Sequence, residues 1–245
     1  MPSVRIGTSG WHYGHWRGPY YPPSVPPRAL LNYYAQDFDT VEINNSFYRL
    51  PSTTTFDTWS KATPEGFCFA VKASRFLTHR KKLLDPEPAL ARLLEVAEGL
   101  GGKLGPILFQ LPPNWHCHVD RLEAFLRALP PGQRYTIEFR DQSWHTRQVL
   151  ELLREYNVAF CIYELAGIRS PIEVTADFVY VRLHGPGDKY QGDYSISSLK
   201  TWAGHVKRWV KSRCHVYVYF DNDQAGYAVK NARELKRIIT PDPDV

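Results

Sequence analysis

Six ionisable side chains lie on the less apolar faces of four strand-like runs in this sequence. Side chains alternate across a strand with period two, and the opposite face of each run is made of branched or aromatic residues. Burying isolated charges is costly, and pairing them recovers the cost only in part. The alternation therefore predicts a polar pocket with a chemical task, lined by Glu42, Lys72, Glu138, Arg140, Arg182 and His184.

The residue types in this set suit proton transfer. Two carboxylates that face one cavity, Glu42 and Glu138, can act as acid and base. Lys72 can stabilise the charged form of Glu42 or act as a base itself, and His184 ordinarily titrates near neutral pH. The alternative interpretation is a purely structural network, in which Glu42 pairs with Lys72, and Glu138 with Arg140 or Arg182.

A small positive excess favours an anionic ligand. Lys72, Arg140 and Arg182 outnumber Glu42 and Glu138 by one charge, and guanidinium groups suit phosphate and carboxylate. Alternation in the run His215–Asn222 directs the face of Tyr217, Tyr219 and Asp221 inward, and an inward Asp221 would cancel the excess.

Aromatic residues are concentrated in segments that follow the expected strands. The first loop, Gly10–Pro27, is long enough to suggest a function, and Trp11 and Tyr48 are candidates for stacking on a sugar or a base. The loop Gly185–Asp193 reads GPGDKYQGD, which fits either a mobile lid or a plain flexible loop.

Apolar runs alternate with amphipathic stretches along all 245 residues. This order predicts a parallel sheet, and the length favours one TIM-like (β/α)8 barrel domain over residues 1–245, with the helix after strand six short or missing. Strands are expected at Val4–Ser9, Thr40–Phe47, Phe67–Ala73, Gly105–Leu111, Tyr135–Arg140, Ala159–Glu164, Phe178–His184 and His215–Asn222. Helices are expected at Pro27–Gln36, Thr53–Ala62, Pro88–Gly99, Val119–Ala128, Thr146–Tyr156, Ser197–Lys211 and Gln224–Ile238.

Composition narrows the class of protein. Charged residues make up 22% and hydrophobic residues 43%, which indicates a globular chain, and the net charge of +5 is too small to indicate nucleic acid by itself. Four widely spaced cysteines and an N-terminus that enters a strand at once predict a cytoplasmic, reduced protein. We expect no metal and no cofactor: neither Glu42, His184 and Asp221 nor the trio His116–His118 has a dedicated ligand spacing.

Seven segments together resemble one known family. The chain resembles the proteins grouped as domain of unknown function 72, the YecE-like proteins, over nearly its whole length. The segments are GTSGWHYGHW, FDTVEINNSFYRLP, KASRFLTH, LGPILFQLPP, EFRDQSW, YVRLHG and YFDNDQAGYAVKNA, which begin at Gly7, Phe38, Lys72, Leu104, Glu138, Tyr180 and Tyr219.

The resemblance implies a TIM-barrel-like fold and supplies no reaction. It adds Asn44, Arg75, Gln110 and Asn222 to the candidate substrate-binding residues, beside Arg140 and Arg182. The family often has asparagine where this chain has Asp221, so we expect no essential acid role for Asp221.

Three functions compete at this point. The first is a metal-independent hydrolase or lyase that acts on a small polar, anionic substrate, phosphorylated or sugar-derived, with Glu42, Lys72, Glu138 and His184 as catalytic residues. The second is a nucleic-acid-binding or nucleic-acid-processing protein, which a steep salt dependence of binding would reveal. The third is a barrel that binds a ligand without turnover. The sequence predicts no membrane partner and leaves the oligomeric state open.

Overall fold

A computed structural model describes residues 2–240 of the chain. Its residues group into two compact units. Unit 1 comprises the described residues of Met1–Glu42, Ile162–Ser170 and Asp177–Val245, and unit 2 comprises Ile43–Cys161 and Pro171–Ala176. Strand β6 (Ala159–Leu165) begins in unit 2 and ends in unit 1, and β2 (Thr40–Ile43) crosses the boundary after Glu42.

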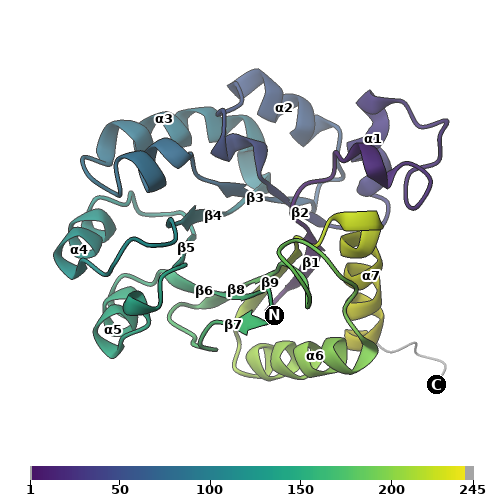
Figure 1. The fold of residues 1–245 in the computed structure, drawn as a ribbon. Coiled ribbons are helices and arrows are strands. Elements are labelled where there is room, and N and C mark those ends of the chain that lie inside the picture. The colour runs from purple at the N-terminus through teal and green to yellow at the C-terminus, as the bar shows by residue number, and fades with distance from the viewer. Residues whose placement is uncertain (1, 241–245) are drawn as a thin grey trace. The chain divides into compact units, whose positions relative to one another are not determined.

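Unit 1 is built on parallel strands from both ends of the chain. Strand β1 (Val4–Thr8) pairs with β9 (His215–Phe220), and β9 pairs with β8 (Phe178–Leu183), with Val4 opposite Val216 and Phe178 opposite His215. The end of β6 follows next to β8. Helices α6 (Ile196–Lys211) and α7 (Tyr227–Ile239) pack against β9 and against each other (Figure 1), and α1 (Leu30–Tyr34) precedes β2.

The longest helix of unit 1 shows why these residues form this element. Ser195 caps α6, because its side chain accepts a hydrogen bond from the Ser198 amide at 3.2 Å. Apolar residues recur at helical spacing along α6, and Leu199, Trp202 and Val206 are buried. The capped, amphipathic helix thus holds one apolar side against the sheet that carries the polar strand ends.

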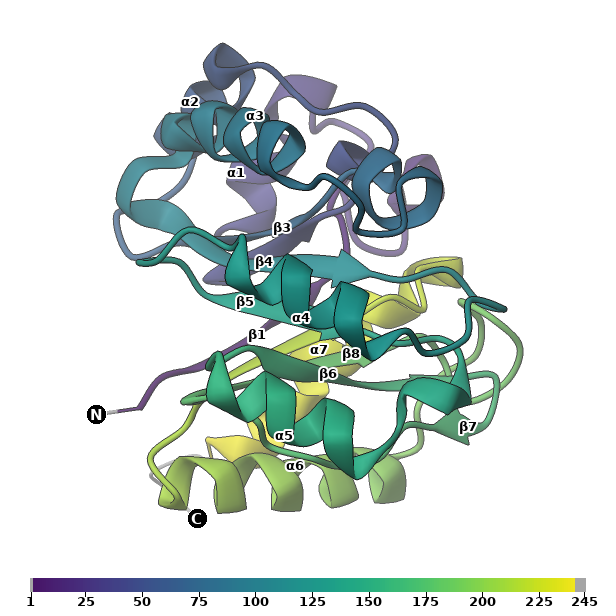
Figure 2. The same ribbon diagram turned by 90° about the vertical axis from the view of Figure 1, so that its left-hand side faces the viewer.

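Unit 2 repeats the strand–helix alternation. Strands β3 (Cys68–Lys72), β4 (Leu104–Gln110), β5 (Tyr135–Glu138) and the beginning of β6 pair in that order, all parallel. Helices α2 (Thr53–Lys61) and α3 (Glu87–Ala97) lie side by side (Figure 2). Helices α4 (Val119–Arg127) and α5 (Arg147–Glu155) are also in contact with each other.

The second strand is shorter than the alternation predicts. It ends at Ile43, and a 3-10 turn, η3 (Asn45–Phe47), follows. The one hydroxyl proton of Ser46 is donated to the Lys72 carbonyl at 2.6 Å, with the Ile43 carbonyl 3.1 Å away, so a side chain takes the place of a backbone hydrogen bond beyond Ile43. The expected strand over Thr40–Phe47 is therefore too long at its C-terminal end.

The segment after β6 contains no helix among the described residues 166–177. A two-residue strand, β7 (Ile168–Arg169), folds back antiparallel onto the end of β6. Left-handed Ala166 and Gly167, with φ of 50° and 75°, form the reversal. The prediction of a short or missing helix after strand six is confirmed.

No helix within residues 2–240 combines the length and the apolar character that crossing a membrane requires.

Candidate functional site

A buried arginine joins two carboxylates in unit 1. Arg182, on β8, is only 1% exposed. Its Nε donates to Glu42 Oε2 at 3.0 Å, and its Nη2 donates to Glu42 Oε1 at 2.7 Å and to Asp221 Oδ2 at 2.9 Å. Such charge-assisted, forked contacts fix geometry strongly. The donors of Arg182 are thereby directed at protein carboxylates from the ends of β2 and β9.

Glu42 receives two further hydroxyl donors. Tyr180, two residues before Arg182 on the same strand face, donates to Glu42 Oε2 at 2.6 Å, and the Ser9 hydroxyl donates to Oε1. Burial raises the pKa of Tyr180 well above its ordinary value, and the charge of Glu42 raises it further. Tyr180 therefore remains a protonated donor. Protein groups supply the hydrogen bonds to Glu42 that water would supply to an exposed carboxylate.

The imidazole of His184 lies between Asp221 and Arg182. Nδ1 of His184 is 2.9 Å from Asp221 Oδ2, and Nε2 is 3.3 Å from Arg182 Nη1. A guanidinium can only donate, so Nε2 of His184 must accept and the ring proton belongs on Nδ1, facing the carboxylate. The imidazole of this Asp–His pair is completely buried, Asp221 is 6% exposed, and the Tyr190 ring lies edge-on 5.5 Å from the imidazole.

Asn222 anchors the loop that follows β8. Its amide nitrogen donates to the Gly192 carbonyl and to Asn231 Oδ1, both at 2.8 Å, while its buried Oδ1 has no hydrogen-bond partner within residues 2–240. At the other end of the loop, Gly185 has a φ of 109°, and a Cβ there would lie 2.0 Å from the Gln191 carbonyl oxygen. The loop is thus closed by close backbone approach at one end and by Asn222 at the other.

Unit 2 carries the second predicted carboxylate. Glu138, at the end of β5, is fully buried and forms an ion pair with the Nε of Arg140, which is 10% exposed. The thiol of Cys161 lies 3.8 Å from Glu138 Oε2. The sequence left open whether Glu138 pairs with Arg140 or with Arg182, and in this unit Glu138 pairs with Arg140.

Positive charge gathers around the end of β3 in unit 2. The ammonium of Lys72 lies 4.4 Å from the centre of the Phe47 ring, a cation–π contact. Burial lowers the pKa of His79, and Lys72, Arg75 and Arg140 lower it further. Three cations thus act on one imidazole, while Glu138 pairs with one of them, Arg140.

The remaining predicted binding residues differ in accessibility. Gln110 is 9% exposed and its amide donates to the Leu111 carbonyl at 2.8 Å, whereas Asn44 is half-buried and its Oδ1 has no hydrogen-bond partner among the described residues. Trp11 is 9% exposed and its carbonyl accepts from the Tyr21 hydroxyl at 2.6 Å. Tyr48 is 73% exposed, so its ring face is available to a ligand.

Sequence reasoning missed Ser9 and left Asp221 undecided. A lone serine in GTSGW carries no chemical signal, although its place at the end of β1 is the signal that strand topology offers. Asp221 follows the last residue of β9, where strand alternation no longer fixes direction, and only its contacts with Arg182 and His184 place it.

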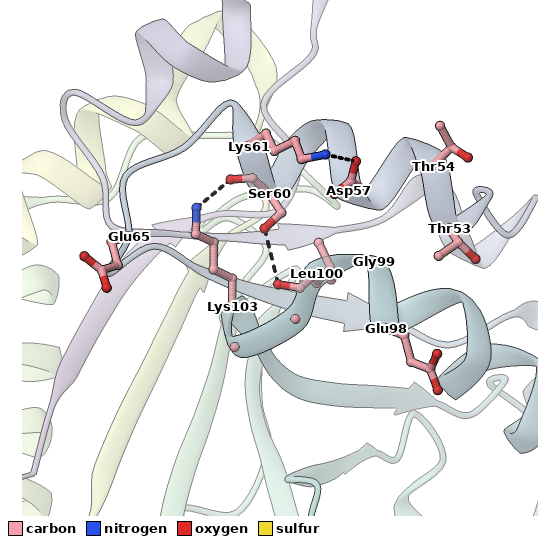
Figure 3. Close-up of a pocket in the computed structure, with 12 residues that line it drawn as sticks. Thr53, Thr54, Asp57, Ser60, Lys61, Glu65, Glu98, Gly99, Leu100 and Lys103 are labelled. Carbon is pink, nitrogen blue, oxygen red and sulfur yellow. Dashed lines mark hydrogen bonds and ion pairs between the residues drawn. The ribbon is translucent and has the colours of Figure 1, made fainter.

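A surface cavity of about 970 Å³ in unit 2 contains none of the predicted site residues. It is lined by α2 and by the 3-10 segment η5 (Glu98–Lys103), and Figure 3 shows Lys103 pointing back at α2. The Lys103 ammonium donates to the Ser60 and Thr63 carbonyls at 2.5 and 2.8 Å. These contacts give Lys103 a structural role in joining two elements.

Within the described part of the chain, no group of three or more histidine, cysteine, aspartate or glutamate side chains is arranged to hold a metal ion.

Comparison with known proteins gives a consistent family and fold. The family model described as "Protein of unknown function DUF72" matches residues 5–244. The UPF0759 protein YunF of Bacillus subtilis is 24% identical over 96% of this chain and 94% of its own length. The UPF0759 protein YecE of Escherichia coli is 28% identical over 45% of this chain and 41% of its own.

The fold is shared with a solved structure. The crystal structure of a DUF72 family protein from Thermotoga maritima is 29% identical, covers 97% of this chain and 99% of its own, and superposes with a TM-score of 0.87. The predicted fold class, a TIM-like (β/α)8 barrel, is thereby confirmed.

Proposed function

Since the chain belongs to the DUF72 family, whose name leaves its reaction open, we propose a function from the chemistry of its own residues. The protein is a metal-independent enzyme of the hydrolase or lyase type that acts on a small anionic substrate, phosphorylated or sugar-derived. Carboxylates and a histidine at the strand ends transfer the proton.

One observation carries this proposal: the completely buried set Glu42, Arg182 and His184, closed by Asp221 at 6% exposure. Replacing a buried ion network by apolar residues is often neutral or stabilising, so stability alone gives a poor reason for it. In barrels of this class, the C-terminal strand ends carry the active site. Both facts favour a catalytic role.

In the proposed mechanism, His184 moves the proton. Its Nδ1 lies 2.9 Å from Asp221, and its Nε2 takes the proton from the substrate when the 3.3 Å contact with Arg182 Nη1 opens. Glu42 and Asp221 carry two negative charges against one on Arg182, which offsets the positive charge that His184 gains. Arg182 then acts as a positioning residue that keeps both carboxylates in place, which differs from the anion-binding role expected from the sequence.

Unit 2 by itself contains a second candidate cluster, which suits an anionic group. Lys72, Arg75 and Arg140 place three positive charges near His79, against one carboxylate, Glu138. Guanidinium and ammonium groups in this proportion suit a phosphate or carboxylate. Glu138, held by Arg140, is the second acid–base candidate.

The test measures the turnover of a panel of sugar phosphates and sugar acids. The reaction is monitored by NMR in a buffer that contains EDTA. Glu138→Gln and Glu42→Gln should each lower kcat by about 100-fold or more, the usual contribution of a positioned acid or base. The matched control is Glu95→Gln on the exposed side of α3, which should leave kcat unchanged.

Each outcome decides something. Full activity of Glu138→Gln with an unchanged Tm removes Glu138 from the reaction. Turnover that EDTA abolishes and a divalent cation restores contradicts metal independence. Saturable binding of a panel member without conversion favours the non-catalytic barrel instead.

A further inference from the structure

Two exposed aromatic side chains in unit 2 belong to segments that contact each other. Tyr48 is 73% exposed and Phe76 is 47% exposed. Phe47, which is nearly buried, connects the two segments, because its ring lies 5.1 Å from that of Tyr48 and 5.0 Å from that of His79 in the π-helical turn η4 (Phe76–Arg80). Single exposed rings are common, whereas two on adjoining segments define a surface.

Basic side chains flank these rings along the chain. Arg49, Arg75, Arg80 and Lys82 are all exposed, and within residues 2–240 none of them forms an ion pair with an acidic side chain. Their neighbour Lys81 is the exception, since it pairs with Asp85 at 3.4 Å. We call the six residues Tyr48, Arg49, Arg75, Phe76, Arg80 and Lys82 the basic–aromatic surface.

The backbone under this surface is held in a strained shape. Lys82 and Leu83 have φ of 47° and 66°, a region that side-chain-bearing residues adopt at a cost of about 1 kcal/mol or more each. Leu83 is 2% exposed and its amide donates to the Leu77 carbonyl at 3.0 Å, which fixes the turn, and Lys82 lies 5.9 Å from the Trp115 ring. Because the turn is already fixed, ordering it on binding costs little conformational entropy.

We propose that the basic–aromatic surface binds single-stranded nucleic acid. Exposed rings stack on unpaired bases, and the surrounding cations contact the phosphates between them. A duplex is a poorer ligand because its stacked bases offer no open faces to Tyr48 and Phe76. A small anion is also a poorer ligand because it needs one cluster of cations, whereas these cations lie on two segments. Arg75 also belongs to the proposed anion-binding cluster, whereas Arg80 and Lys82 belong to this surface alone, so variants of Arg80 and Lys82 test nucleic-acid binding separately from the proposed reaction.

The test is fluorescence anisotropy of a labelled dT20 oligonucleotide with the full chain. Four phosphate contacts predict a slope of about −3 in log K against log salt for a single strand, which corresponds to roughly 50-fold weaker binding at 200 mM than at 50 mM salt. The double variant Arg80→Glu/Lys82→Glu should bind at least about tenfold more weakly at 50 mM and halve the slope. Tyr48→Ala and Phe76→Ala should each cost roughly tenfold and leave the slope unchanged.

Matched controls come from unit 1. Lys200→Glu/Lys207→Glu reverses two exposed charges on α6, and Ile196→Ala removes an exposed apolar side chain. Neither should change dT20 binding by more than about twofold. A duplex of equal length should bind at least about tenfold more weakly than dT20.

Three results would overturn the assignment. The first is no binding of dT20 at 50 mM salt. The second is an equal loss in the control and surface variants, which would indicate a diffuse charge effect. The third is binding to phosphatidylserine vesicles, lost in the same variants, with no binding to dT20, which would identify a lipid surface as the partner.

Discussion

Replacing Arg182 by methionine should destabilise the protein more than any exposed substitution. Methionine fills much of the same volume but removes the guanidinium donors that reach Glu42 and Asp221, which are 0% and 6% exposed. Leaving a buried charge without its partner costs about 3–5 kcal/mol. For a chain of this size, that cost lowers the Tm by roughly 10 °C.

The double variant Arg182→Met/Glu42→Gln separates charge from packing. If uncompensated charge is the cause, removing one of the two orphaned carboxylates should recover part of the loss, roughly 1–2 kcal/mol.

The assay is urea unfolding followed by tryptophan fluorescence, with Arg28→Met as the exposed control in the same unit. Arg28→Met should change the free energy of unfolding by less than about 0.5 kcal/mol. The reasoning fails if Arg182→Met costs less than about 1 kcal/mol, or if the second substitution adds to the first without recovery.

Three further predictions follow from single side chains. Tyr180→Phe removes the hydroxyl that donates to Glu42 at 2.6 Å and should cost about 1.5–3 kcal/mol by urea unfolding; a cost near zero would mean that Glu42 does not depend on that donor. The pKa of His79 is lowered in the folded state, so the unfolded chain binds more protons near pH 6.5 and stability falls as the pH drops through that value; His79→Gln should flatten this part of a plot of Tm against pH, and an unchanged slope would contradict the assignment. Gly185→Ala should lower the Tm by several degrees because of its φ of 109°, whereas Gly204→Ala inside α6 should raise it slightly, and equal effects would show that the backbone at Gly185 relaxes freely.

Strand alternation predicted the main cluster because period two is a geometric property of any strand. It placed Arg182 and His184 on one face, and the contact between their side chains agrees with that. The method failed where side chains replace backbone hydrogen bonds, as at Ser46, whose hydroxyl ends the second strand early.

Other features depend on contacts that no local pattern contains. Asp221 lies beyond the last residue of β9, so its direction follows from Arg182 and His184 alone. The exposure of Tyr48 depends on its neighbour Phe47 being the ring that turns inward against His79. Composition cannot distinguish a packed ring from an exposed one, and hence the sequence alone could not locate the basic–aromatic surface.

The side chains that contact Arg182 in unit 1 come from distant parts of the sequence, so they are synthesised at different times. Arg182 meets Ser9 and Glu42 across separations of 173 and 140 residues, and Asp221 arrives 39 residues after it. Contacts at such separations form late in folding, because the loops between them must close first. During synthesis, Arg182 therefore stays hydrated until β9 and Asp221 have been made. A fragment that ends before Asp221 lacks one of the two carboxylates that Arg182 contacts in the folded protein.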